Sequence, residues 1–432
     1  MRNASMKSAF GVLLGLFLSV QSTSGQLPGA SPATLGTAYN YTALARGFAA
    51  IGLNPAGLGL PETEGVSFSL FPVQVSQFLD PLTFSDILDY KGVLLPGSVK
   101  EGWVNDIAAA GGQNGLGRLE VTAFSLSWGH LGLQLSTIAS GYAHLTDSAA
   151  ELLLFGNAGR TGDAGDFEIE GSILNGYAVT TLGVSYGFPL ARRWVPGVEQ
   201  GLSLGFTIKQ SWGHGVVFAE DAGTKLLQSD PLRINLNFPV IYPGGEGGNF
   251  SKGSGMGVDV GVAWERGPWA ASAAVLNIVH SFEWDLTELV YRPGLAVFDG
   301  NENNSSFEAV AAGEAPPDLR NKIADMTFKP SIVLAGAYDA LENLSVSAEI
   351  KQRTGDGLDT GPKSHIGLGL EYFPTPTVPI RAGFAAITDG FQFGGGLGVV
   401  LGPVHLGLAG LYQTGDVGDG LAGTFGISFV RK

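Results

Sequence analysis

The sequence predicts an all-β protein: an antiparallel up-and-down transmembrane β-barrel of about 14 strands, with an N-terminal plug and short loop helices. Three observations lead to this prediction: an export leader, a composition poor in charge and rich in glycine, and apolar residues at every second position. The 432 residues include 66 Gly and no Cys, with 15% charged residues and a mean hydropathy of +0.20. A soluble domain averages about 25% charged residues and about 7% glycine. The composition therefore argues against an ordinary cytosolic enzyme.

Residues 1–25 have the three parts of a secretory signal peptide. Arg2 and Lys7 precede an apolar run over 9–20, and small residues follow up to Gly25. That run is too short to span a bilayer well, and no later stretch reaches eighteen apolar residues. We expect cleavage after this leader and export of the mature chain. Cleavage removes two positive charges and takes the net charge from −15 to −17, which argues against nucleic acid as a partner.

Alternation with a period of two predicts the strands of the barrel. In "GMGVDVGVAWE" (255–265), apolar Met and Val positions alternate with Gly, Ala and acidic positions. A soluble sandwich would carry Lys, Glu and Thr densely on its polar face, whereas here that face is mainly Gly, Ala and Ser. The predicted strands are 66–74, 119–128, 131–142, 175–187, 201–213, 255–265, 268–277, 331–340, 344–353, 364–373, 378–387, 391–402, 404–413 and 421–430.

The barrel domain is expected to run from 66 to 432, with three long loops. These loops lie near 143–174, 214–254 and 278–330, and they are rich in Asp, Asn, Gly and Pro. Outer-membrane barrels keep their periplasmic turns short, so we expect these loops to be extracellular.

A short amphipathic helix is predicted within residues 83–112. Val99, Trp103 and Ile107 recur at helical spacing behind Ser98, which we expect to cap the helix. A helix packed within a loop is the simpler interpretation, and a helix over or inside the barrel mouth is the alternative.

Residues 26–65 are expected to form a plug, or hatch, inside the barrel. The stretch "ARGFAAIGLNPAGLGL" (45–60) is too interrupted for a helix and too irregular for a strand, because Pro55 lacks an N–H and glycine is frequent. Small residues let a backbone approach the wall closely, and the Asn54 amide can bond to polar groups of the wall. A lumen of fourteen strands has room for such a segment.

This stretch resembles the N-terminal hatch of the fatty-acid-channel superfamily of outer-membrane proteins, the FadL/TodX type, which carries an Asn-Pro-Ala motif. The matching positions are Asn54, Pro55 and Ala56, followed by Gly57. Later segments such as "GVDVGVAW" and "HIGLGLEYFPTPTVPIRAGF" look closer to the PorV/PorQ-like branch. The chain departs from typical members by ending in "FVRK" instead of a terminal aromatic.

The resemblance implies a protein of the bacterial outer membrane, in contact with its lipid, and two kinds of activity. One is hatch-gated uptake of hydrophobic or amphipathic small molecules. The other is a PorV-like role in protein secretion, in which the loops bind secretion-system or surface proteins; a purely structural surface protein is a third possibility.

Seven charged side chains are predicted to face the lumen: Asp259, Glu265, Glu349, Lys351, Arg353, Glu371 and Arg381. Opposite charges at these positions can pair and hold the wall together. A ligand role is the alternative, in which Glu349, Arg353 and Arg381 form a cluster near one end and arginine binds a carboxylate head group.

Enzymatic motifs and metal ligands are not recognisable. The six histidines are scattered, there is no cysteine, and no nucleophile elbow, P-loop or HExxH motif occurs. The loop "DGNENNSSFE" (299–308) begins like a calcium loop, but its glycine position holds Asn304 and its twelfth position holds Val310. We therefore expect no enzyme activity, no metal and no cofactor.

Overall fold

The computed structural model describes residues 27–61, 65–163, 165–190, 201–229, 232–244, 249–299, 303–358, 361–415 and 418–431. The predicted signal peptide at 1–25 lies outside these residues, as does the first residue of the predicted plug. No helix in the described ranges is long and apolar enough to cross a membrane.

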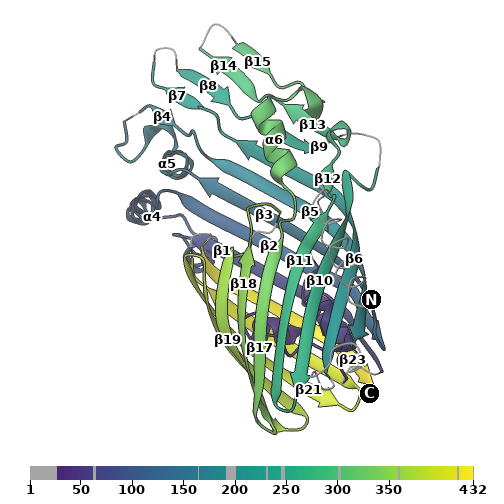
Figure 1. Ribbon diagram of the computed structural model, residues 1–432. Coiled ribbons are helices and arrows are strands. Elements are labelled where there is room, and N and C mark those ends of the chain that lie inside the picture. The colour runs from purple at the N-terminus through teal and green to yellow at the C-terminus, as the bar shows by residue number, and fades with distance from the viewer. Residues whose placement is uncertain are drawn as a thin grey trace.

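Fourteen long antiparallel strands of the described chain form a closed barrel (Figure 1). Each strand pairs with its neighbours in chain order, and β1 closes the wall by pairing with β23. The strands are β1 (Val66–Asp80), β2 (Gln113–Trp128), β3 (Leu131–Leu145), β5 (Ile173–Pro189), β6 (Leu202–Glu220), β10 (Gly253–Arg266), β11 (Trp269–His280), β17 (Ser331–Leu341), β18 (Leu344–Arg353), β19 (Ser364–Thr375), β20 (Val378–Ile387), β21 (Gly390–Leu401), β22 (Val404–Gln413) and β23 (Asp419–Arg431).

The alternating pattern explains which face of the wall each residue occupies. In β19, Ile366, Leu368 and Leu370 point outward and are exposed, while the intervening positions are buried inside. The same alternation recurs around the barrel, so that the outer surface is an apolar belt. The predicted fold class is confirmed, and all 14 predicted strands are present, several of them longer than predicted.

The two ends of the barrel differ in the length of their connections. At one end, which we call the short-turn end, two-residue turns join neighbouring strands, as at 129–130 and 267–268. At the other end, which we call the long-loop end, the connections 81–112, 146–172, 221–252 and 281–330 are much longer. The predicted long loops therefore lie at the same end of the barrel. They are shorter than predicted because the strands that flank them are longer.

Residues 27–61, which we call the N-terminal segment, lie inside the short-turn half of the barrel (Figure 1). The segment contains α2 (Pro32–Gly36) and the short 3₁₀ helices η1 (Gly47–Ala50) and η2 (Pro55–Gly59). It contacts strands on several sides of the wall: α2 lies against β20 to β23, η1 against β1 to β3, and η2 against β5, β6 and β10. Most of its residues are buried.

The long loops carry additional elements that the sequence did not predict. Five short strands form a separate sheet in the order β15 (Asn303–Ser306), β14 (Leu295–Phe298), β8 (Arg233–Asn237), β7 (Lys225–Leu227) and β4 (Phe167–Glu168). The remaining elements are α5 (Asp147–Phe155), η4 (Gly156–Ala158), β9 (Val240–Pro243), β12 (Glu283–Trp284), η5 (Leu286–Glu288), β13 (Leu289–Arg292), β16 (Val310–Ala311), η6 (Ala312–Glu314) and α6 (Pro317–Asp325).

The β11–β17 loop folds onto the long-loop end of the wall. Phe282, Trp284 and Phe328 of this loop form a buried aromatic cluster, and the Trp284 indole donates to the Met326 carbonyl at 2.8 Å. Residues of α6 and of β3, β5 and β6 complete one hydrophobic core with them, which we call the mouth core. It is the largest cluster of buried apolar side chains in the described chain.

The loop between β1 and β2 contains α3 (Phe84–Asp89) and α4 (Gly97–Ala110). The predicted amphipathic helix is α4, and its Ile107 packs with Ala150 of α5 at the long-loop end. The predicted Ser98 cap is wrong: the helix begins at Gly97 after Pro96, and no side chain caps it. Proline suits this boundary because its fixed φ favours the extended conformation before a helix.

Candidate functional site: a chamber above the N-terminal segment

Asn54 of the predicted motif is buried against the wall and tied to its backbone. Its Nδ2 donates to the carbonyls of Val262 and Ala273 at 3.1 and 3.3 Å, and its Oδ1 accepts from the Ala56 amide at 3.0 Å. Val262 and Ala273 face each other across β10 and β11. The Asn54 side chain therefore caps η2 and contacts two strands at once.

Asn40 makes the same kind of contact at another part of the wall, and the sequence analysis missed it. Its Nδ2 lies 3.2 and 3.3 Å from the carbonyls of Leu368 and Phe384, which are directly paired between β19 and β20. Its Oδ1 lies 3.0 Å from Nε2 of His365. Runs of inward glycine in β19 and β20 were the available signal, because a Cβ at Gly367 would lie only 2.6 Å from Asn40 Oδ1.

Two charged residues of the wall also hold the N-terminal segment. The Glu349 carboxylate accepts from the Thr42 amide and hydroxyl at 3.1 and 3.0 Å. Glu265 pairs with Arg46 at 2.5 Å. The segment is thus attached to the wall by directional polar contacts, in addition to the apolar packing of Leu35 and Ala38 against β22 and β23.

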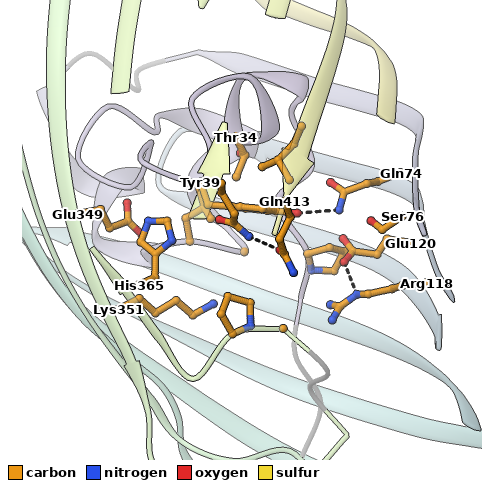
Figure 2. A pocket seen from close by; sticks show the side chains of 18 of the residues that line it. Thr34, Tyr39, Gln74, Ser76, Arg118, Glu120, Glu349, Lys351, His365 and Gln413 are labelled. Atoms are coloured by element: carbon orange, nitrogen blue, oxygen red, sulfur yellow. Dashed lines mark hydrogen bonds and ion pairs between the residues drawn. The ribbon is translucent and has the colours of Figure 1, made fainter. Parts of the chain in front are cut away.

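A chamber of about 140 Å³ lies between the N-terminal segment and the long-loop half of the barrel (Figure 2). Its floor is formed by Thr34, Tyr39 and Thr42, and Gln74 of β1 donates to the Tyr39 hydroxyl at 2.9 Å. Much of its remaining lining is apolar: Leu27, Phe78, Leu116, Leu276, Val333 and Leu411. An apolar cavity of about 150 Å³ in another protein binds benzene, so this chamber has room for one aromatic ring.

Lys351 is the chamber's unpaired cation. Figure 2 shows Lys351, Arg118 and Glu120 around the chamber, where Arg118 and Glu120 pair at 2.6 Å. The Lys351 ammonium has neither a hydrogen bond nor an ion pair to any described residue. An anionic group entering the chamber could therefore bind Lys351 without displacing a protein partner.

A second cavity of about 390 Å³ adjoins the chamber on the long-loop side. The two cavities share Leu116, Gly361, Pro362 and Gln413 in their linings. Tyr177 and Phe218 of the mouth core line the outer cavity. The two cavities are therefore adjacent, with the outer one beside the mouth core and the chamber beside the N-terminal segment.

All seven predicted lumen charges lie on the inner face, but they do not form one cluster. Arg353 donates to the carbonyls of Gly355 and Gly361 at the long-loop end, and Arg381 pairs with Glu371 at 2.7 Å near the short-turn end. Strand register places Arg353 and Arg381 about eight residues apart along the wall, roughly 26 Å at 3.3 Å per residue. Glu349 lies between them, so Glu349, Arg353 and Arg381 cannot share one ligand head group.

Asp259 belongs to a sealed polar group in the wall. Lys209 of β6 bonds to Asp259 at 2.6 Å and to the Asn277 side chain, and the Asn277 amide donates to Asp259 at 2.7 Å. Lys209 and Asn277 were not predicted. The pair is fully buried, which makes a structural role in joining β6, β10 and β11 the direct interpretation.

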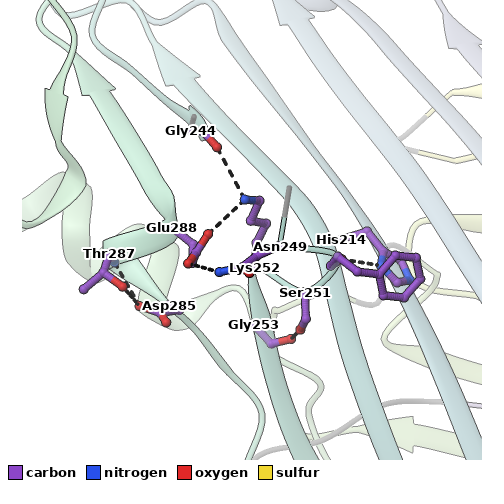
Figure 3. A network of polar contacts seen from close by, with 10 residues as sticks. His214, Gly244, Asn249, Ser251, Lys252, Gly253, Asp285, Thr287 and Glu288 are labelled. Carbon is purple, nitrogen blue, oxygen red and sulfur yellow. Dashed lines mark hydrogen bonds and ion pairs between the residues drawn. The ribbon is translucent and has the colours of Figure 1, made fainter. Parts of the chain in front are cut away.

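A polar network fastens two loops to each other at the long-loop end (Figure 3). Glu288 accepts from Lys252 at 2.9 Å and from Asn249 at 2.5 Å. These hydrogen bonds lower the pKa of the Glu288 carboxyl, and bonds from Thr287 lower the pKa of Asp285. No set of three or more metal-ligating side chains comes together within the described ranges.

The fold is similar to that of solved structures of a FadL homologue and of TodX. A structure titled as a Pseudomonas aeruginosa FadL homologue matches with a TM-score of 0.51 and 13% identity, over 95% of this chain and 99% of that one. The Pseudomonas putida toluene transporter TodX matches with a TM-score of 0.55 and 11% identity, over 94% and 99%. The sequence itself matches no family model and no curated protein. The resemblance in fold to FadL/TodX-type barrels is therefore established by structure.

Proposed function

We propose that this protein is an outer-membrane channel for hydrophobic or amphipathic small molecules, with the N-terminal segment acting as its hatch. The observation that carries the proposal is the chamber, which combines apolar with polar side chains, contains Lys351 with no ion pair to a described residue, and ends on the N-terminal segment. The outward apolar belt suits a bilayer, and the acidic long loops suit the cell exterior. The toluene transporter that shares this fold supports the same class of cargo.

In this proposal a molecule enters through the cavities at the long-loop end and rests in the chamber. Its apolar part contacts Leu276 and Val333, and an anionic or polar head lies near Lys351. Passage then requires the N-terminal segment to rearrange, because Thr34, Tyr39 and Thr42 close the chamber floor. Asn54, Pro55, Ala56 and Gly57 hold the hatch to the wall.

The test is mass spectrometry of small molecules that co-purify with the barrel in lipid nanodiscs. We expect a bound hydrophobic or amphipathic molecule in the wild type, with reduced occupancy in Lys351→Gln. Arg266→Gln is the matched control, since Arg266 is an exposed residue at the end of β10, away from the chamber. An empty barrel in every variant would contradict the channel proposal.

A second candidate function is a PorV-like role in which the long loops bind a protein partner. The five-stranded sheet favours it, because Leu295 and Val297 of β14 are exposed apolar residues beside the edge strand β15. Leu295→Asp with Val297→Asp would then abolish binding of a secreted protein while leaving small-molecule occupancy unchanged. An empty chamber together with such a loss would favour this function over transport.

A further inference from the structure

A third cavity, of about 590 Å³, lies at the short-turn end. We call it the vestibule. Three arginines line it: Arg46, Arg381 and Arg431. Arg46 pairs with Glu265 and Arg381 pairs with Glu371, which leaves Arg431 as the arginine of the lining that has no ion pair to a described residue. The vestibule is therefore suited to attract an anion.

The vestibule combines this charge with apolar surface. Phe48, Phe373 and Val400 contribute to the lining. Arg381 bonds to Glu371 through Nε and Nη2, both to one carboxylate oxygen at 2.7 Å, while Nη1 has no partner among the described residues. A few polar groups in a largely apolar pocket of 300–1,000 Å³ are typical of small-molecule sites.

One layer of the N-terminal segment separates the vestibule from the chamber. Thr34, Tyr39 and Thr42 line the chamber, whereas Tyr41 and Arg46 line the vestibule. Residues 31–46, which we call the partition, therefore contribute side chains to both cavities. Burial raises the pKa of the Tyr41 hydroxyl above its usual range.

The motif residues behave differently from the partition. No residue of η2 lines either cavity, and η2 packs against β5, β6 and β10. A Cβ on Gly205 would lie 2.1 Å from the Ala56 amide nitrogen, so the wall fits this helix at backbone contact. The motif is thus an anchor, and the partition is the part that stands between the two cavities.

We propose that the vestibule is a second binding site for an amphipathic anion, on the exit side of the partition, and that the partition moves while η2 stays anchored. The proposal rests on the proposed function, since the same molecule would leave Lys351 and bind beside Arg381. It adds to that function an exit route along the barrel axis, which we call the axial exit, and a binding site in the vestibule at the end of that route.

The first test counts binding sites for anilinonaphthalene sulfonate, an anion with an apolar body, on the barrel in nanodiscs. We expect two sites per wild-type barrel. Lys351→Gln should weaken one site at least tenfold, and Arg381→Gln should weaken the other by a similar factor. Arg266→Gln, at the same end but outside the vestibule, should titrate like the wild type, and empty nanodiscs give the background.

His405→Trp keeps the test decisive if Arg381→Gln misfolds. His405 lines the vestibule, and tryptophan there fills the cavity while leaving the Arg381–Glu371 pair intact. If this variant retains both sites, the vestibule proposal is overturned while the channel function stands. If the wild type has a single site, which Arg381→Gln weakens and Lys351→Gln leaves unchanged, the chamber function fails instead.

The second test locks the partition to the wall. A Cβ on Gly407 would lie 3.1 Å from Cβ of Pro32, slightly closer than the usual disulfide separation of about 3.5–4.5 Å, so a small backbone shift brings the two positions to disulfide geometry. Because the chain has no cysteine, Pro32→Cys with Gly407→Cys forms a single defined cross-link. We expect oxidation to slow release of the probe from proteoliposomes at least tenfold, and reduction to restore it.

The matched control is Thr181→Cys with Ser211→Cys. These residues face each other across β5 and β6 with their oxygens 2.9 Å apart, so their disulfide joins wall to wall and leaves the partition free. Probe release that is equally fast with the partition locked would overturn the axial exit. Release lost in both oxidised variants would show a general effect of oxidation and count against the partition as well.

Discussion

The short-turn half and the long-loop half of the barrel interior are filled in different ways. In the short-turn half, the N-terminal segment meets the wall through small residues and hydrogen bonds from Asn40 and Asn54 to strand carbonyls. In the long-loop half, the β11–β17 loop buries large side chains such as Phe282 and Phe328 in the mouth core. The short-turn half thus combines directional contacts with clusters of mainly small apolar residues, whereas large apolar side chains fill much of the long-loop half.

This difference bears on which half can move. Buried apolar area contributes about 25 cal/mol per Å², so a core of aromatic and branched side chains is costly to open. Each hydrogen bond contributes only about 0.5–1.5 kcal/mol of net stability. Losing one bond destabilises mainly the segment that it holds in place. The N-terminal segment can therefore detach in part, whereas the mouth core opens only at a high cost.

Gly205→Ala should have the largest effect, because the seat of η2 has no room for a methyl group. The added Cβ meets backbone atoms of Pro55 and Ala56 at 2.2 and 2.1 Å, so we expect more than the roughly 1–3 kcal/mol typical of overpacking. Hydrogen exchange by mass spectrometry should show residues 47–61 unprotected. Gly395→Ala, where the methyl group meets nothing within 4 Å, should leave their protection unchanged.

Phe328→Ala should destabilise only the long-loop half. Phe328 is fully buried against Phe282, and removing such a ring costs about 3–5 kcal/mol. Limited proteolysis should cut the 281–330 loop readily while the N-terminal segment keeps its exchange protection. Phe250→Ala, at an exposed ring, is the control. Simultaneous loss of protection in both halves would show that the two fillings are not independent.

The sequence predicted the wall far better than the mouth. Membrane-type strands such as β19 alternate strictly and pair with chain neighbours, so a local pattern was sufficient. The sheet of β4, β7, β8, β14 and β15 joins segments more than a hundred residues apart, and its strands have at most five residues. The formation of such strands depends on tertiary contacts, which a local alternation of apolar and polar residues does not reveal.

Asn40→Ala and Asn54→Ala should each cost about 1–3 kcal/mol locally, with different consequences. Loss of Asn54 removes the cap of η2 and should raise exchange over 47–61. Loss of Asn40 loosens the partition and should speed probe release from proteoliposomes while 47–61 stays protected. Equal exchange patterns in the two variants would remove the distinction between anchor and partition.

Only one of these two asparagines was predicted, for a physical reason. Asn54 precedes Pro55 in a stretch that cannot form regular structure, which makes it visible in the sequence. Asn40 lies in an ordinary stretch, and its role depends on glycines more than three hundred residues away in β19 and β20. Lys351 was predicted to face the lumen, but its lack of a partner follows only from the packed structure.

The smallest expected effect lies in the loop network around Glu288, and it depends on pH. Hydrogen bonds from Lys252 and Asn249 lower the pKa of Glu288 below its ordinary value of 4.5. The network therefore contributes stability above that pH and loses it as the pH falls through the lowered pKa.

We compare exchange rates over 249–253 in wild type and Glu288→Gln at each pH, which cancels both intrinsic exchange and the contribution of Asp285. The variant should exchange faster near pH 7, and the difference should disappear as the pH falls through the lowered pKa of Glu288. A difference that persists at low pH would mean that Glu288 acts through packing and not through its charge, and the long-loop half would then depend on apolar contacts even at its rim.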